Sequence, residues 1–156
     1  MDFTLTQKET MILEDGKKQE DICVKKYQSF ANQAKDPELK NLFNKLATEE
    51  QHHLNIIDQL LKGNTPNLTH NFQSQGNQQT QQSGSGNMTF NSAQDALLCG
   101  DLLSTEKYVS SFYDTGVFES ANKQVRTALQ HIQKEEQKHG ELLFNYMNSN
   151  GMYNVK

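Results

Sequence analysis

Two ten-residue segments of the sequence share the pattern Glu-Glu-Gln-x-His. TEEQHHLNII occupies residues 48–57, and KEEQKHGELL occupies residues 134–143, so the second lies at an offset of 86 from the first (134 − 48 = 86). A glutamate and a histidine three residues apart lie on the same side of a helix, so both can reach one metal ion. Two such pairs, with one carboxylate from each of two further helices, form the ligand set of dinuclear metal sites in four-helix bundles. The repeated motif therefore indicates a site of this kind.

The first segment allows two frames, because it contains two glutamates followed by two histidines. In the second segment Lys138 occupies the position that corresponds to His52, so only one glutamate and one histidine there have the required spacing. The same frame then applies to the first segment. The predicted ligand pairs are Glu50 with His53 and Glu136 with His139.

A dinuclear site needs two further carboxylates, and the first helical segment offers Glu20. It lies in an apolar stripe that includes Leu13, Cys23 and Tyr27. A lone carboxylate in an apolar core costs several kcal/mol unless it is paired. A pair of divalent metal ions would be a common partner for all the carboxylates of such a core.

The third helical segment contains two candidates, Asp101 and Glu106. The interval from Glu106 to Glu136 equals the interval from Glu20 to Glu50. Distances from the turns favour Asp101, because it precedes a turn centred near residue 118 by almost the interval at which Glu136 follows it, whereas Glu106 lies much closer to that turn. Asp101 also precedes a tyrosine by seven residues, as Glu20 does. The predicted metal ligands are therefore Glu20, Glu50, His53, Asp101, Glu136 and His139.

The sequence around these residues predicts four helices and no strand. A capping box at Thr6 and Glu9 begins the first helix. Asp36-Pro37 ends it and begins the second, which stops at Gly63. The fourth helix ends before Gly151, and β-branched residues are too sparse for a strand. We expect one all-α domain over residues 1–156, a four-helix bundle of two helical hairpins at 6–62 and 92–150.

Apolar residues at helical spacing define a core-facing stripe on each helix. On the third helix, which is expected to fade near residues 114–116, Asp101 lies among the apolar residues of this stripe. The expected stripe consists of Leu97, Leu98, Leu102, Thr105, Tyr108 and Phe112.

Residues 63–90 separate the two hairpins and differ from them in composition. Eleven residues of this segment are Asn or Gln, seven are Gly or Ser, and none is charged. Such a segment has too little apolar surface to fold alone. A helix of about 25 residues is roughly 37 Å long, and the segment can span more than that when it is extended. It is therefore predicted to be a long crossover between the second and third helices.

The overall composition argues against several classes of protein. A net charge of −4 and the absence of a basic patch disfavour a nucleic-acid-binding protein. The longest apolar run, residues 96–99, is too short to span a membrane, and no secretory signal is visible at the N-terminus. Cys23 and Cys99 form no CxxC motif, so neither a zinc knuckle nor a disulfide framework is indicated. Synthesis in the cytoplasm is the expectation.

Both halves of the sequence resemble known families. The first half resembles the rubrerythrin branch of the ferritin-like superfamily through Glu20, Tyr27, Phe30, the alanines at 31 and 34, and residues 50–53. The second half resembles the coat F family of spore coat proteins. The residues that carry this second resemblance are 101–103, 107–108, 119–122, 125–126, 135–137, 146–147 and 151–153.

These resemblances imply a ferritin-like bundle in a spore-coat or sporulation-associated protein. Such a protein would be made in the cytoplasm and incorporated into the spore coat, with other coat proteins as partners and a homodimer as a further option. Carboxylate-rich ligation with two imidazoles suits a dinuclear centre of Fe or Mn. The alternative hypothesis is a di-iron or di-manganese oxidoreductase that acts on peroxide or oxygen. Against it, the third helix offers Asp where the iron enzymes have Glu, and the sequence has no rubredoxin-type segment of four cysteines.

Overall fold

The computed structural model describes residues 1–70 and 90–156, with side chains from residue 93 onward in the second part. These residues form four helices: α1 (Gln7–Gln33), α2 (Pro37–Leu61), α3 (Phe90–Glu119) and α4 (Lys123–Ser149). The described residues contain no strand, so the predicted all-α fold of four helices is confirmed. Within the same two ranges, no helix is both long and apolar enough to cross a bilayer.

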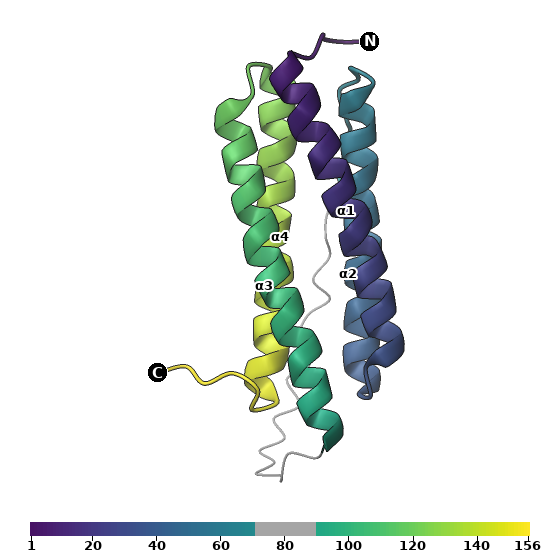
Figure 1. Ribbon diagram of the computed structural model, residues 1–156, viewed down its shortest axis with the longest axis vertical. Coiled ribbons are helices and arrows are strands. Elements are labelled where there is room, and N and C mark those ends of the chain that lie inside the picture. Colours follow the sequence, from purple (N-terminus) through teal and green to yellow (C-terminus); the bar gives the residue numbers. More distant parts are fainter. Residues whose placement is uncertain (71–89) are drawn as a thin grey trace.

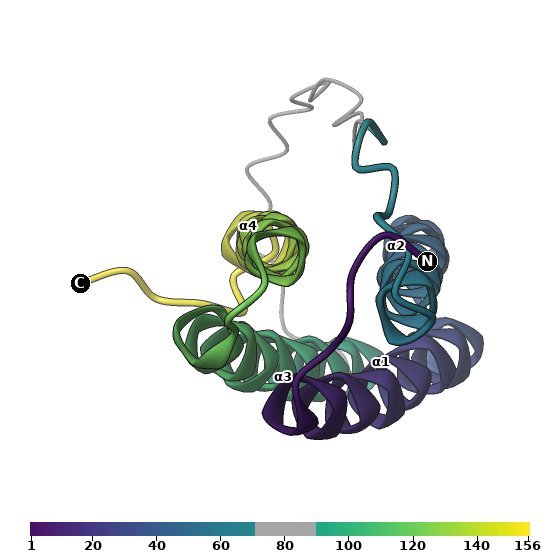
Figure 2. The same cartoon turned by 90° about the horizontal axis from the view of Figure 1, so that it is seen from above.

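The helices pair as two hairpins that lie against each other. α1 packs mainly on α2, and α3 packs mainly on α4. α1 and α3 run side by side along one face of the bundle, with α2 and α4 on the opposite face (Figures 1 and 2). α2 ends and α3 begins at opposite ends of the bundle, as a crossover between them requires (Figure 1). Most of the predicted crossover, residues 71–89, lies outside the described residues.

Local sequence signals account for the start of α1 and the bounds of α2. The amide of Glu9 donates to Thr6 Oγ1 at 3.1 Å, and the amide of Thr6 donates to Glu9 Oε2 at 2.8 Å, which completes a capping box. Asp36 caps α2 by accepting a hydrogen bond from the amide of Glu38 at 3.0 Å. After α2, Gly63 has a φ of 70°, a left-handed conformation that glycine adopts without strain.

α3 differs from the expectation at its C-terminal end. It continues through the predicted fading point at residues 114–116 and ends at Glu119. Gly116, which suggested a stop, lies inside the helix at a close contact with the next helix. A Cβ at this position would lie 3.0 Å from Leu129 Cδ1. The glycine therefore serves helix packing.

The buried face of α3 also differs from the predicted stripe. Leu97 is 72% exposed and Tyr108 is 64% exposed, whereas Val109 and Tyr113 are almost completely buried. Leu98 and Leu102 are buried as expected. Apolar residues occur on more than one side of this helix, so their spacing alone did not define the face that meets the core.

The core consists of two apolar clusters in different parts of the bundle. One includes Phe43, Leu46 and Leu143, and the other includes Leu13, Ile57 and Leu129. All six side chains are at most 1% exposed. The glutamates and histidines of the repeated motif are also buried near the middle of their helices. The apolar core is therefore interrupted by a polar layer that needs internal partners.

Each hairpin caps the turn of the other with a buried carboxylate. Glu9 on α1 accepts hydrogen bonds from the amide and the side-chain nitrogen of Asn122, both at 2.7 Å. Asp95 on α3 accepts from the amides of Lys35 and Asp36 at 2.9 and 3.0 Å. Glu9 and Asp95 are separated by the same offset as the repeated motif (95 − 9 = 86). These contacts fix how the two hairpins are positioned along each other.

Replacing Glu9 with Ala should therefore destabilise the bundle. The change removes the acceptor for the Asn122 amide and its side chain, and it also breaks the capping box. We expect a loss of about 2–3 kcal/mol in the free energy of unfolding, measured by urea titration. Glu14→Ala, on the exposed side of the same helix, is the control and should change stability by less than about 0.5 kcal/mol. Equal effects of the two changes would contradict this role for Glu9.

Candidate metal centre

The two motif pairs meet in the middle of the bundle as a buried layer. Glu50 and His53 on α2 face Glu136 and His139 on α4, and all four side chains are at most 1% exposed. The imidazole rings of His53 and His139 are nearly parallel, with centroids 5.4 Å apart. The frame chosen from the second motif is therefore the one that points inward, and His52 lies outside this layer.

Glu50 and Glu136 each contact both histidines. His53 Nδ1 lies 3.1 Å from Glu50 Oε2 and 3.1 Å from Glu136 Oε1. His139 Nδ1 lies 3.1 Å from Glu50 Oε1 and 3.3 Å from Glu136 Oε2. In each carboxylate, one oxygen therefore contacts His53 and the other contacts His139. Both carboxylates could therefore contribute a ligand atom beside each histidine.

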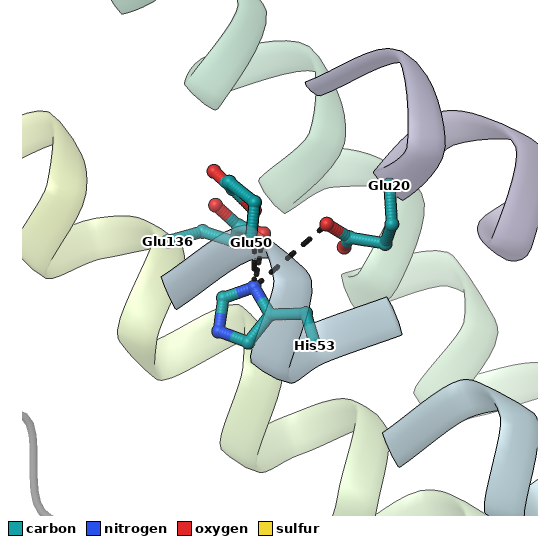
Figure 3. A group of neighbouring side chains, drawn as sticks. All are labelled: Glu20, Glu50, His53 and Glu136. Carbon is teal, nitrogen blue, oxygen red and sulfur yellow. Dashed lines mark hydrogen bonds and ion pairs between the residues drawn. The ribbon is translucent and has the colours of Figure 1, made fainter. Parts of the chain in front are cut away.

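The other two helices each supply one further carboxylate. Glu20 on α1 lies on the side of His53, with Oε2 at 3.8 Å from His53 Nδ1 (Figure 3). Glu106 on α3 lies on the side of His139, with Oε1 at 3.6 Å from its Nδ1. The result is two ligand groups that share Glu50 and Glu136. Within each group one donor atom per residue lies within 4.8 Å of the others: Glu20, Glu50, His53 and Glu136 in one, and Glu50, Glu106, Glu136 and His139 in the other.

The structure does not bring Asp101 into this layer. Its side chain is 44% exposed and forms an ion pair with Lys26, with Nζ 3.1 Å from Oδ2. Glu106 occupies the place expected for Asp101, because the second turn lies at residues 120–122 and not near residue 118. Ala121, in this turn, is midway in the sequence between Glu106 and Glu136. The equal spacing of the glutamates in both hairpins was therefore the better guide.

Two buried tyrosines connect the hairpins at this layer. The hydroxyl of Tyr27 donates to Glu106 Oε1, and the hydroxyl of Tyr113 donates to Glu20 Oε1. Burial, together with the nearby carboxylates, raises the pKa of both tyrosines well above the usual value, so both remain donors. Tyr113 follows Glu106 by seven residues, as Tyr27 follows Glu20. Asp101 and the exposed Tyr108 have the same spacing, which favoured Asp101 as the predicted ligand.

The electrostatics of the layer separate its carboxylates into two kinds. Burial, and then the charges of Glu50 and Glu136, raises the pKa of Glu20 and of Glu106 well above the usual range. Burial also opposes the charge of Glu50, but His139 and His53 hold the pKa of this carboxyl well below its usual range. The pKa values of both histidines are raised by the carboxylates against the effect of burial. Without metal, protons thus provide the positive charge that the layer needs.

Two carboxylate oxygens of the layer, one on α1 and one on α3, lack a donor among the described residues and would fit a metal ion. Glu20 Oε2 and Glu106 Oε2 are buried, and neither accepts a hydrogen bond from the described residues. A buried carboxylate oxygen without a donor is unfavourable unless a cation contacts it. The charges also match, because four carboxylates balance two divalent ions. The residues present therefore fit a dinuclear centre.

A further glutamate, Glu135, was not predicted from the sequence and contacts His53 through the ring nitrogen that faces away from Glu50 and Glu136. Glu135 Oε2 lies 2.8 Å from His53 Nε2, on the opposite side of the ring from Nδ1. A carboxylate in this position orients a metal-binding imidazole and fixes its tautomer. Glu135 precedes Glu136 directly, so the Glu-Glu pair of the motif places one carboxylate inside the layer and one behind it.

Comparison with a family of known proteins gives a match in the second hairpin. Residues 94–156, which include most of α3 and all of α4, match the model of the Coat F domain. This range contains Glu106, Glu135, Glu136 and His139. No curated protein matches the chain.

Comparison with solved structures gives a match over nearly the whole chain. The chain is similar to a two-domain protein from Anabaena variabilis ATCC 29413 that contains DJ-1/ThiJ/PfpI-like and ferritin-like domains. The TM-score is 0.70 at 15% sequence identity, with 97% of this chain covered. The chain spans 40% of the length of that protein, and at this identity the similarity shows the fold alone. The resemblances that the sequence suggested are thus confirmed at this level: the chain has the ferritin-like fold, and its residues 94–156 match the Coat F domain.

Proposed function

We propose that the protein is a spore coat component whose bundle holds a dinuclear centre of iron or manganese. The observation that carries the metal part is the pair of buried ligand groups that share Glu50 and Glu136. In this proposal residues 1–156 act as one domain, because each hairpin contributes half of the ligands. The coat part is supported by the Coat F match in the second hairpin, and the partners would be other coat proteins.

The ligands would be three residues from each hairpin. Oxygen donors with two imidazoles suit Fe and Mn, which prefer harder ligands than the thiolates that select Zn or Cu(I). When bound, the ions would supply Lewis-acid and electron-transfer chemistry. The chain's own contribution is to exclude water, to hold Glu20 and Glu106 through the tyrosine hydroxyls and to orient His53 through Glu135. The proposed ligands are Glu20, Glu50, His53, Glu106, Glu136 and His139.

An oxidoreductase that acts on peroxide or oxygen is the second candidate, and one observation favours it. The ligand predicted from the sequence on the third helix is Asp101, where the iron enzymes have Glu. Glu106 on α3 is buried, with Oε1 3.6 Å from His139 Nδ1, which supports a glutamate as the ligand from this helix. The ligand set then contains four glutamates, which removes one of the two departures from the iron enzymes. The lack of a four-cysteine segment remains, so the electron donor would have to be a separate molecule.

The metal proposal predicts opposite results for Glu106 and Asp101, the two carboxylates of α3 that were candidate ligands. Removing a residue that only supports a metal ligand costs about 10–100-fold in affinity, so removing a ligand should cost about a hundredfold or more. Glu106→Gln should therefore weaken binding of Fe²⁺ or Mn²⁺ by this amount, measured by metal analysis and competition with a chelator. Asp101→Asn is the matched control and should leave binding unchanged. Protein should be purified without a chelating column, and equal binding by both variants would contradict the assignment of Glu106.

The coat proposal predicts where the protein is found in a sporulating culture. Fractionation of purified spores should recover it in the coat layer, and the amount should rise during sporulation. Antibody detection in coat extract, spore core and vegetative extract would measure this. Recovery only in the soluble extract of vegetative cells would argue against a coat component, whatever the metal content.

The two candidate functions differ in turnover. As an oxidoreductase, the metal-loaded protein should consume hydrogen peroxide when a reductant is supplied, and the metal-free protein and Glu106→Gln should not. Asp101→Asn should retain the activity. A metal-loaded protein that shows no consumption above free Fe²⁺ or Mn²⁺ would leave the centre with a structural role.

A further inference from the structure

All five histidines of the chain lie in or beside the same region of the bundle. His53 and His139 belong to the buried layer, and the other three, His52, His70 and His131, are partly exposed. Two further carboxylates accompany them: Glu49 is 7% exposed and Glu135 is 3% exposed. We call these five residues, Glu49, His52, His70, His131 and Glu135, the outer cluster.

On the α2 side, the outer cluster joins two separate parts of the chain. His70 follows α2 and places Nε2 3.1 Å from Glu49 Oε2. Its ring meets the ring of His52 edge-on, with centroids 3.9 Å apart. Glu49 and His52 are three residues apart on one helix, the same spacing as the ligands Glu50 and His53. Two imidazoles and a carboxylate thus lie beside one another at the surface, and a rotation of the two imidazole side chains would direct their nitrogens to one ion.

On the α4 side, the outer cluster is in direct contact with the buried layer. His131 Nε2 lies 3.3 Å from Glu135 Oε1, and the other oxygen of Glu135 lies 2.8 Å from His53 Nε2. Glu135 therefore stands between a partly exposed histidine and a buried metal ligand. Glu49 contacts His70 and directly precedes the buried Glu50 in sequence.

The repeat indicates that the histidines are not simply partners for the acidic side chains. Residues separated by the offset of the repeat occupy equivalent positions in the two hairpins, and His52 then corresponds to Lys138, and His131 to Lys45. Lysine serves as well as histidine where only a positive charge near a carboxylate is needed. It is not a metal ligand when protonated, whereas neutral imidazole is a common one. The outer cluster therefore has imidazole where the equivalent positions have ammonium groups.

We propose that the outer cluster is a second metal site, in which Glu49, His52 and His70 bind a divalent first-row transition ion at the surface and deliver it to the buried centre. The mixture of imidazole and carboxylate donors suits Mn²⁺, Fe²⁺, Co²⁺ or Zn²⁺ more than Ca²⁺ or Mg²⁺, which take oxygen ligands. The partly exposed His52 and His70 can turn to meet an ion from solvent. The binding step stands on the outer residues themselves, and the delivery step rests on the proposed function.

The test titrates the metal-free protein with Co²⁺ alone. The double change Glu50→Gln and Glu136→Gln removes the two carboxylates shared by the buried groups and leaves the outer cluster intact. This variant should still bind Co²⁺, with the imidazole NMR signals of His52 and His70 shifted. Adding His52→Ala and His70→Ala to it should abolish the remaining binding.

In the otherwise wild-type chain, His52→Ala with His70→Ala should leave the buried centre able to fill. Filling should be slower by about tenfold, because the local concentration of the ion at the surface is lost. Gln51→Ala with Thr69→Ala, exposed neighbours on the same two segments, is the matched control and should fill at the wild-type rate. Stopped-flow absorbance of Co²⁺ measures the rate.

The outcomes separate this inference from the proposed function. If wild type binds Co²⁺ but the variant with Gln at 50 and 136 binds none, and the loss of His52 and His70 does not slow filling, the outer site is overturned and the buried centre stands. If wild type binds Co²⁺ only through His52 and His70, the outer site stands and the buried centre fails. Folding of each variant is checked by its thermal transition, and the kinetic comparison does not depend on the variants at 50 and 136.

Discussion

Four glutamates in the middle of an apolar bundle are the constraint on which the rest of this structure depends. Burying four negative charges together is prohibitive without positive charge in the same place. The layer can meet that need with protons, as the raised pKa values of Glu20, Glu106 and both histidines indicate. Two divalent ions would meet it as well, and they would also contact the oxygens that no protein donor among the described residues reaches. The carboxyl groups and imidazoles that hold these protons in the metal-free layer are therefore the groups that would release protons when a metal binds.

The buried side-chain hydrogen bonds of the described residues run mainly between the hairpins, and two pairs of contacts between the hairpins are related by one offset. Tyr27 donates to Glu106 while Tyr113 donates to Glu20. Glu9 caps the second turn while Asp95 caps the first. Each hairpin therefore supplies hydrogen-bond donors to the buried carboxylates of the other. Neither hairpin could bury its glutamates alone. This mutual dependence explains why the chain needs a long connection from α2 to α3: the hairpins must be placed with α1 beside α3, so the second must begin at the far end of the bundle.

Most of the fold and three of the four residues in each ligand group could be predicted from short-range patterns. The capping box, Asp36-Pro37 and the Glu-x-x-His spacing are local, and each requires only the geometry of one helix. The carboxylate of α3 could not be chosen in this way, because its position depends on where a turn falls between two helices. Gly116 resembled that turn but is a packing position beside Leu129. Apolar residues on several sides of α3 then made Asp101 and Tyr108 resemble buried residues. Applied to every position, the offset of the repeat relates Glu20 to Glu106 and Tyr27 to Tyr113, and it would have identified both.

The departures from this offset are as informative as the agreement. The buried layer keeps the same residue at each pair of equivalent positions, since both halves must supply the same donors to a symmetric centre. The residues around the layer differ between the two hairpins. At the offset of the repeat, His52 corresponds to Lys138, Lys45 to His131, and Cys23 to Val109. Glu135 holds His53, whereas Glu49, its equivalent, contacts His70 from the segment after α2. A layer that only stabilised the bundle would not require different residue types around its two halves. The asymmetry places the imidazoles of His52 and His70 beside Glu49 of α2, and in our proposal an ion from solvent binds there first.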